Sequence, residues 1–198
     1  MTDTAALLTA PALADPSWAD RVRAVMPETL LDEEEEFDED RDEDQARQDL
    51  EALCAEVLAD ERAIAHPDWG ALVRGVVALS VDYRALTEDA YGEALDPDGA
   101  ADDEGGVVDL ITDFGLSTIG LAFGLLSHPA AVRRVDWASL VRHVLEEKRR
   151  RFGTGAFLSE GWEECDALFA SEVVRAHPEA RALHALASEI LPLEGEPF

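Results

Sequence analysis

The sequence predicts an all-α protein, a compact helical bundle of about seven or eight helices in a single domain spanning 1–198. Apolar residues recur at the three- and four-residue spacings of amphipathic helices. The alternation of β-branched and aromatic residues that indicates strands between tight turns is nearly absent. Three His-Pro pairs and one linker rich in Asp and Gly divide the chain into segments of helical length. With 198 residues, of which 47% are hydrophobic, the chain can bury one sizeable core.

The predicted helices begin and end at these breaks. Proline disfavours helical geometry in the residue before it and is accepted in a first turn, so each His-Pro pair separates two helices. The linker, DPDGAADDEGG, covers 96–106. The predicted helices span 17–26, 41–65, 68–95, 107–127, 136–151, 160–176 and 178–190.

The helix at 107–127 is expected to lie buried at the centre of the bundle. It is long enough to cross a bilayer, but it contains two aspartates and follows an acidic linker. Gly115, Gly120 and Gly124 allow neighbouring helices to approach it closely. We therefore expect a helix buried among other helices, and no membrane span.

A nine-residue pattern occurs three times, as SWADRVRAV from Ser17, DWGALVRGV from Asp68 and DWASLVRHV from Asp136. Ser or Asp can accept hydrogen bonds from the free amides at a helix start. The Trp and the two Val residues fall on one helical face, which predicts that they are buried. The Arg five residues after each Trp falls off that face and is expected at its edge or in solvent.

Similarity between the two halves extends beyond this pattern. LLTAPA in the first half resembles LLSHPA in the second, and EALCAEVLADERAIAHP resembles DALFASEVVRAHP. Because order and approximate spacing both persist, we predict two tandem pseudo-repeats, 7–79 and 125–190, with 80–124 inserted between them. Chance similarity among Ala- and Leu-rich helices is the alternative.

The chain is strongly acidic, with 44 acidic residues against 16 Lys plus Arg and a formal net charge of -28. This charge argues against binding to nucleic acid or to an anionic membrane surface, since both are negative. Lys148 is the single lysine. A salt-adapted or GC-rich background would produce the same composition.

The densest charge is an acidic tract at 32–44, with eleven carboxylates in thirteen positions. Such a run repels itself, and its charges cannot be buried without partners. Phe37 is its one apolar residue. The predicted partner-binding residues are Asp32, Glu33, Glu34, Glu35, Glu36, Phe37, Asp38, Glu39 and Asp40. A solvated spacer is one alternative, and pairing with the basic cluster that begins at Lys148 is another.

The sequence predicts no catalytic site, metal site or cofactor. Cys54 and Cys165 lie on hydrophobic stripes and are expected in the core of a reduced, cytoplasmic chain. The five histidines lack partners at metal-ligand spacing. Glu35, Glu36 and Glu39 match an acidic metal-binding pattern, but a charge run contains almost any acidic spacing.

These features predict a non-enzymatic, acidic, helical protein-binding module: an inhibitor, an immunity-type protein or an adaptor for a basic partner. Electrostatic attraction would speed association and select that partner. One alternative is a helical-bundle enzyme that uses carboxylate-bound Mg or Mn. Another is a salt-adapted housekeeping protein whose acidity is environmental.

Overall fold

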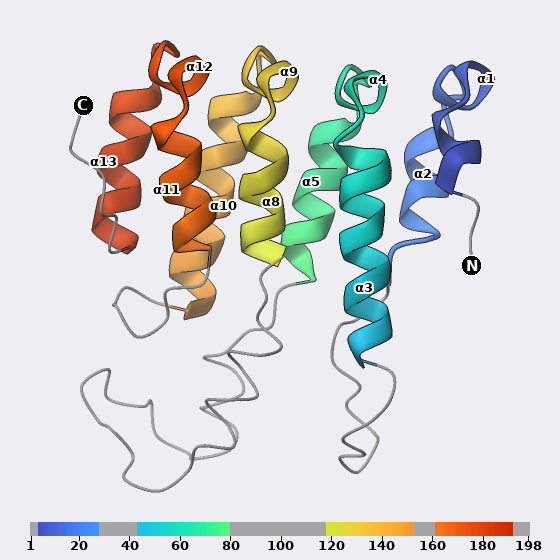
Figure 1. The fold of residues 1–198 in the computed structure, drawn as a ribbon, viewed down its shortest axis with the longest axis horizontal. Coiled ribbons are helices and arrows are strands. Elements are labelled where there is room, and N and C mark those ends of the chain that lie inside the picture. Colours follow the sequence, from blue (N-terminus) through green and yellow to red (C-terminus); the bar gives the residue numbers. More distant parts are fainter. Residues whose placement is uncertain (1–3, 28–42, 80–117, 153–160, 192–198) are drawn as a thin grey trace, which may run out of the picture.

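The computed structural model describes residues 4–27, 43–79, 118–152 and 161–191, which are the coloured parts of Figure 1. Eleven α-helices, one 3-10 helix and one π-helical segment occur in these ranges, and no β-strand does. The predicted all-α class is therefore confirmed. Four of the eleven helices are single turns of four residues, which explains most of the difference from the seven or eight expected.

These elements form four helical hairpins, each with a first helix, a one-turn helix and a last helix. Hairpin 1 comprises η1 (Thr4–Leu8), α1 (Ala10–Leu13) and α2 (Trp18–Arg23). Hairpin 2 comprises α3 (Glu43–Leu53), which continues into η2 (Cys54–Leu58), then α4 (Glu61–Ile64) and α5 (Trp69–Ala78). Hairpin 3 comprises α8 (Thr118–Ser127), α9 (Pro129–Val132) and α10 (Trp137–Phe152). Hairpin 4 comprises α11 (Trp162–Ala170), α12 (Glu172–Arg175) and α13 (Ala180–Ile190).

The hairpins lie side by side along the long axis of the molecule (Figure 1). The last helices form one row, in which α2 packs on α5, α5 on α10, and α10 on α13. In the other row η2 contacts η1 and α8, and α8 packs against α11. The one-turn helices follow one edge of the array, where α9 contacts α4 and α12. This arrangement resembles an α-solenoid, in which each unit contacts mainly its neighbours.

One continuous core runs through the array. Trp18, Trp69 and Trp137 begin α2, α5 and α10, and all three are fully buried. The valine four residues after each Trp is also buried, and the Arg five residues after it is exposed.

The second Val of the nine-residue pattern is buried in the later two copies, as Val76 and Val144, but Val25 of the first copy is only partly buried. The predicted burial is thus confirmed except at Val25, and the predicted exposure of the Arg is confirmed. The predicted capping is wrong for Ser17 and Asp68, whose side chains accept no hydrogen bond from the first amides of α2 and α5.

Each one-turn helix directly follows a capping position that stands at a constant distance from the last helix of its hairpin. The residues that precede α1, α4, α9 and α12 are Thr9, Asp60, His128 and Ser171, and each stands nine positions before the first residue of the last helix. In the first three, the side chain accepts a hydrogen bond from a backbone N–H of the one-turn helix. Ala180 begins the last helix of hairpin 4, where the other hairpins have Trp. The duplication of 7–79 in 125–190 stays a prediction.

Two segments that were each predicted to form one continuous helix are interrupted in the structure. The segment 41–65 is broken by a turn before Asp60 caps α4, and the segment 160–176 is broken between α11 and α12. Of the helices predicted at 68–95 and 107–127, only α5 and α8 are described, and the remainder of each lies outside the described residues. None of the helices in the described ranges has the length and apolar character needed to cross a membrane.

Helix α8 is largely buried and packs against α5, α10 and α11, as expected for the central helix. Gly120 is buried, and a Cβ placed on Gly161 would lie 3.3 Å from its backbone nitrogen. Gly120 therefore allows the start of α11 to approach, as predicted. Gly124 is exposed with open space around it, so the same prediction is wrong there. Gly115 lies outside the described residues.

Replacing Gly161 by Ala is expected to lower the free energy of unfolding by about 1 to 2 kcal/mol. Its φ of 72° is unfavourable for a residue with a Cβ, and the added atom would lie 3.0 Å from the Ile119 side chain. Gly124→Ala is the matched control, expected to raise stability by about 0.5 to 1 kcal/mol because Ala is the better helix former. Urea denaturation measures both, and equal effects would contradict the packing described.

Candidate functional site

In hairpins 1 to 3, the first and last helices are joined by one recurring hydrogen bond. At the start of α2, α5 and α10, the indole Nε1 donates to the carbonyl oxygen of the residue eleven positions earlier. The distances are 2.9 Å for Trp18, 2.8 Å for Trp69 and 2.9 Å for Trp137. In hairpin 4, where Ala180 replaces Trp, Arg175 Nε donates to the matching carbonyl of Phe169 at 3.2 Å.

A second recurring contact joins one hairpin to the next. In hairpins 2, 3 and 4, the residue three positions before the start of the last helix contacts the buried Trp of the preceding hairpin. The ring centroids lie 4.4 Å apart for His66 and Trp18 and 4.5 Å apart for His177 and Trp137, and the Arg134 guanidinium lies 5.2 Å from the Trp69 ring. The helical pattern of the sequence does not predict this contact, although the three residues share one offset from the start of the last helix.

Arg134 combines three kinds of contact at the junction of hairpins 2 and 3. Its guanidinium binds the carboxylate of Asp136 at 2.8 and 3.0 Å, which lowers the pKa of that carboxyl group. It also donates to the backbone carbonyls of Ile64 and His66. Its position over the Trp69 ring adds a cation–π contact. Arg134 is therefore a structural residue of the array.

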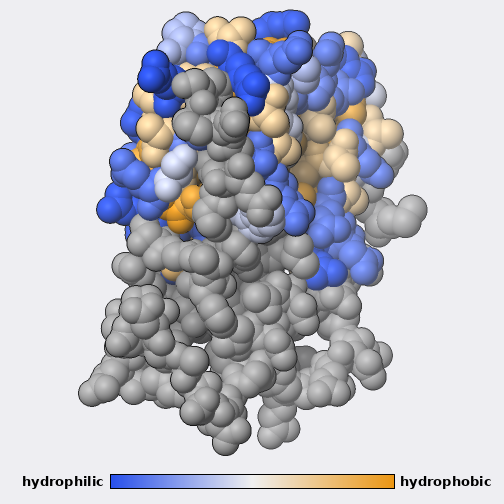
Figure 2. All heavy atoms as spheres, turned by 60° about the vertical axis from the view of Figure 1, so that its left-hand side comes forward, coloured by the Kyte–Doolittle hydropathy of each residue, from blue (hydrophilic) through white to orange (hydrophobic). Residues whose placement is uncertain are grey.

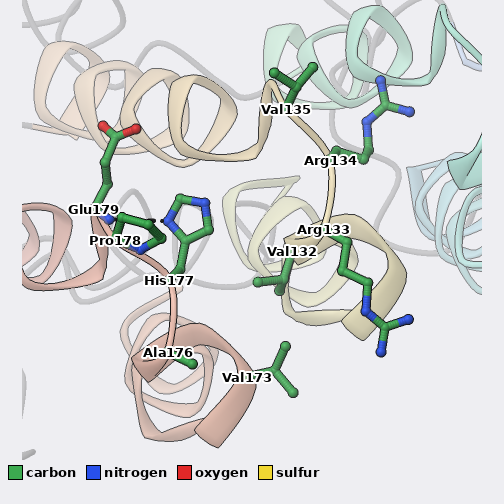
Figure 3. Close-up of a pocket in the computed structure, with 9 residues that line it drawn as sticks. All are labelled: Val132, Arg133, Arg134, Val135, Val173, Ala176, His177, Pro178 and Glu179. Atoms are coloured by element: carbon green, nitrogen blue, oxygen red, sulfur yellow. Dashed lines mark hydrogen bonds between the residues drawn. The ribbon is translucent and has the colours of Figure 1, made fainter.

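An open groove lies where hairpins 3 and 4 meet, between the α9–α10 turn and the α12–α13 turn (Figure 3). The residues that line it are Val132, Arg133, Arg134, Val135, Val173, Ala176, His177, Pro178 and Glu179. In Figure 3 the imidazole of His177 lies between the two turns, and Arg134 points away toward hairpin 2. Val135 and Val173 are the exposed large hydrophobic side chains of the described residues.

The charged side chains of this groove differ in whether they have partners. Glu179 pairs with Arg142 at 3.7 Å, and Arg134 is held by Asp136. Arg133 is exposed, and its guanidinium has no hydrogen bond or ion pair with any described residue. Figure 2 shows this end of the array as a largely hydrophilic surface interrupted by hydrophobic areas. The groove thus offers exposed valines beside a guanidinium that is open to a partner.

The cysteines and the possible metal ligands give no catalytic constellation within the described ranges. Cys54 and Cys165 are free and buried, and burial raises the pKa of Cys54 to about 12 and also raises that of Cys165. Their predicted place in the core is confirmed. Among the described residues, no three His, Cys, Asp or Glu side chains are grouped to hold a metal ion. Glu35, Glu36 and Glu39 lie outside those residues.

The predicted partner-binding residues all lie outside the part of the chain that the structure describes. They are Asp32, Glu33, Glu34, Glu35, Glu36, Phe37, Asp38, Glu39 and Asp40. The described chain resumes at Glu43, where α3 begins within the acidic tract. Binding by these residues therefore stays a prediction.

The basic cluster at the end of α10 has partners inside the array. Lys148 is buried, and its Nζ lies 4.6 Å from the centre of the Phe152 ring. Arg150 and Arg151 bind Glu147 at 2.9 and 3.0 Å. The hydrogen bonds from these two arginines lower the pKa of Glu147 to about 2, and the larger effect comes from Arg150.

Glu147→Gln is expected to lower the free energy of unfolding by about 1 to 2 kcal/mol at pH 7. The folded-state pKa of about 2 lies below the ordinary value of 4.5, so the folded state favours the ionised carboxylate. That stabilisation is present above pH 4.5 and is lost as the pH falls toward 2. Urea denaturation at several pH values should show the difference shrinking across this window. Glu146→Gln, at an exposed neighbour, is the control, and a difference that does not change with pH would contradict the assignment.

The described array is nearly balanced in charge. It contains 19 of the 44 acidic residues and 14 of the 16 basic residues, which leaves 25 acids and 2 bases outside it. The net charge of the array is therefore -5, and the rest of the chain carries -23. The acidity of this protein belongs mainly to segments outside the described helices.

Comparison with known proteins assigns this chain to no family. No protein-family model, curated protein or solved structure matches it. Its function is therefore inferred from its own geometry and charge.

Proposed function

We propose that this chain is a non-enzymatic protein-binding module whose acidic segments select a basic partner. The observation that carries the proposal is the separation of charge, since 25 of 44 acids but 2 of 16 bases lie outside the described array. Clustered negative charge accelerates encounter with a positive protein and disfavours negative ones. The stacked hairpins form an array of a kind that suits protein binding.

The pairing of acids inside the array supports the same proposal. Asp136 and Glu147, for example, are bound by arginines of their own hairpin at 2.8 to 3.0 Å. Such carboxylates stabilise the fold and are already neutralised by their partners. The acids at 32–40 form a dense group in the sequence, and Phe37 adds an apolar contact for a partner.

The chemistry of the tract indicates which partners to expect. Closely spaced carboxylates can take the places that phosphates occupy on a basic protein, so a basic nuclease or DNA-binding protein is a suitable target. An inhibitor, an immunity-type protein or an adaptor would all act in this way. The free thiols Cys54 and Cys165 support a reducing, cytoplasmic location.

The proposal is tested by affinity capture from the native lysate with wild type and a tract variant. In the variant, the eight acids at 32–40 become Ser or Gln, so that the start of α3 is untouched. Wild type should retain basic proteins at low salt and release them at about 0.5 M salt, and the tract variant should retain few. A matched variant with the five acids of 96–104 neutralised should behave as wild type. Identical sets of proteins on wild type and the tract variant would contradict a binding role for the tract.

A further inference from the structure

The exposed large hydrophobic side chains of the described residues both lie in the groove between hairpins 3 and 4. Val135 is 104% exposed and Val173 is 38% exposed. Val135 stands two residues before the start of the last helix of its hairpin. At this position the other hairpins have Pro16, Pro67 and Pro178. A fully exposed valine contributes nothing to the core. Apolar side chains gathered in one groove, unlike scattered ones, are typical of a binding surface.

The charge around this groove is opposite to that of the whole chain. Residues 128–145 and 171–183 contain five Arg and three acids, in a protein with a net charge of -28. Arg133 lines the groove, is exposed and has no partner among the described residues. The other arginine and the glutamate of the lining are paired within the array. One guanidinium is thus left to recognise an external anion.

We propose that this groove binds a short acidic segment of a partner protein, with a carboxylate on Arg133 and aliphatic side chains on Val135 and Val173. A guanidinium and a carboxylate form a short, charge-assisted hydrogen-bonded pair. The groove is open to solvent, so it suits an extended segment rather than an enclosed small molecule. The proposal is independent of the acidic tract, because it concerns residues of hairpins 3 and 4 and a partner segment of the opposite sign.

Methyl NMR of the full-length chain tests the proposal. The probe is a capped hexapeptide of alternating Glu and Leu, and its matched control has Lys in place of Glu. The Glu probe should shift the methyl signals of Val135 and Val173 with a Kd on the order of 1 mM, and the Lys control should not. Binding of both peptides, or of neither, would overturn the proposal.

Two variants locate the binding and leave the fold intact, since both side chains are exposed. Arg133→Gln should weaken the Glu probe roughly tenfold, and Val135→Ser should weaken it severalfold. Arg149→Gln removes an exposed arginine of α10 that does not line the groove, and it should leave affinity unchanged. An unchanged affinity in Arg133→Gln would contradict the proposed pairing.

Two further outcomes separate this proposal from other occupants and from the proposed function. If the groove signals shift with protein concentration alone, a second copy of the chain covers the groove, and the proposal fails. If they are already shifted in wild type and move when the acids of 32–40 are neutralised, the chain's own tract is the occupant, which also overturns it. If the Glu probe binds the tract variant at least as tightly as it binds wild type, the proposal is supported. This result does not depend on whether a basic partner binds the tract.

Discussion

Replacing Trp69 by Ala is expected to lower the free energy of unfolding by about 3 to 5 kcal/mol. The side chain is fully buried, and its Nε1 donates to the carbonyl of Leu58 at 2.8 Å. Its ring also supports the Arg134 guanidinium, so the substitution acts on two hairpins at once. Urea denaturation followed by circular dichroism measures the loss.

Two comparisons isolate the contributions of Trp69. Trp69→Phe keeps an aromatic ring but removes the N–H donor, and we expect about 1 to 2 kcal/mol of destabilisation from the unpaired carbonyl and the lost volume. Trp162→Ala removes a partly buried Trp that lies outside the recurring pattern, and we expect a clearly smaller loss than for Trp69→Ala. Equal losses at Trp69 and Trp162 would mean that the buried Trp residues do not hold the array together.

Replacing Arg134 by Ala is expected to lower the free energy of unfolding by about 2 to 4 kcal/mol. The substitution removes the partner of Asp136 and the donor to two backbone carbonyls of hairpin 2. It also removes the cation over the Trp69 ring. Thermal and urea unfolding should both register the change.

The neighbouring residue provides the matched control for this prediction. Arg133→Ala removes the same charge from an exposed side chain without a partner among the described residues, and we expect a change within about 0.5 kcal/mol. Arg134→Lys keeps the charge but loses the planar guanidinium. Its free energy of unfolding should therefore lie between those of wild type and Arg134→Ala. If Arg133→Ala and Arg134→Ala have the same effect, net charge rather than the junction between hairpins determines stability.

The helical class and much of the core could be predicted because they depend on local periodicity. The Trp-containing pattern places one Trp and its following Val on a single helical face, and burial of that face follows from the hydrophobic effect. Cys54 and Cys165 were placed in the core by the same reasoning, and the structure confirms it. The exposure of the Arg five residues after each Trp could also be predicted, because that residue lies off the buried face.

The turns inside hairpins 2 and 4 could not be predicted from the His-Pro pairs and the linker at 96–106. In hairpin 3 the His128–Pro129 pair marks the start of the one-turn helix, but hairpins 2 and 4 have Asp60 and Ser171 at that position, followed by Glu in each case. Asp and Ser also occur within long helices, so neither residue alone indicates a helix boundary. The constant distance of nine residues to the start of the last helix is the signal that would have revealed both turns.

The groove and the junctions between hairpins could not be predicted because they are contacts between distant parts of the chain. Arg134 and the carbonyl of Ile64 are 70 positions apart, and no local pattern relates them. The exposure of Val135 depends on how hairpins 3 and 4 stack. The acidic tract is conspicuous in composition, whereas nothing in the local sequence distinguishes Arg133 or Val173 from other residues of the helices.

The association rate constant between this chain and its captured basic partner tests the central claim most directly. It should be measured for wild type and the tract variant at about 50 and 300 mM salt, with unfolding curves as the control for folding. We predict that wild type associates about tenfold faster than the variant at low salt, and that raising the salt removes most of this difference. Equal rates for the two proteins at low salt, with both of them folded, would contradict the claim that the acidic tract selects the partner.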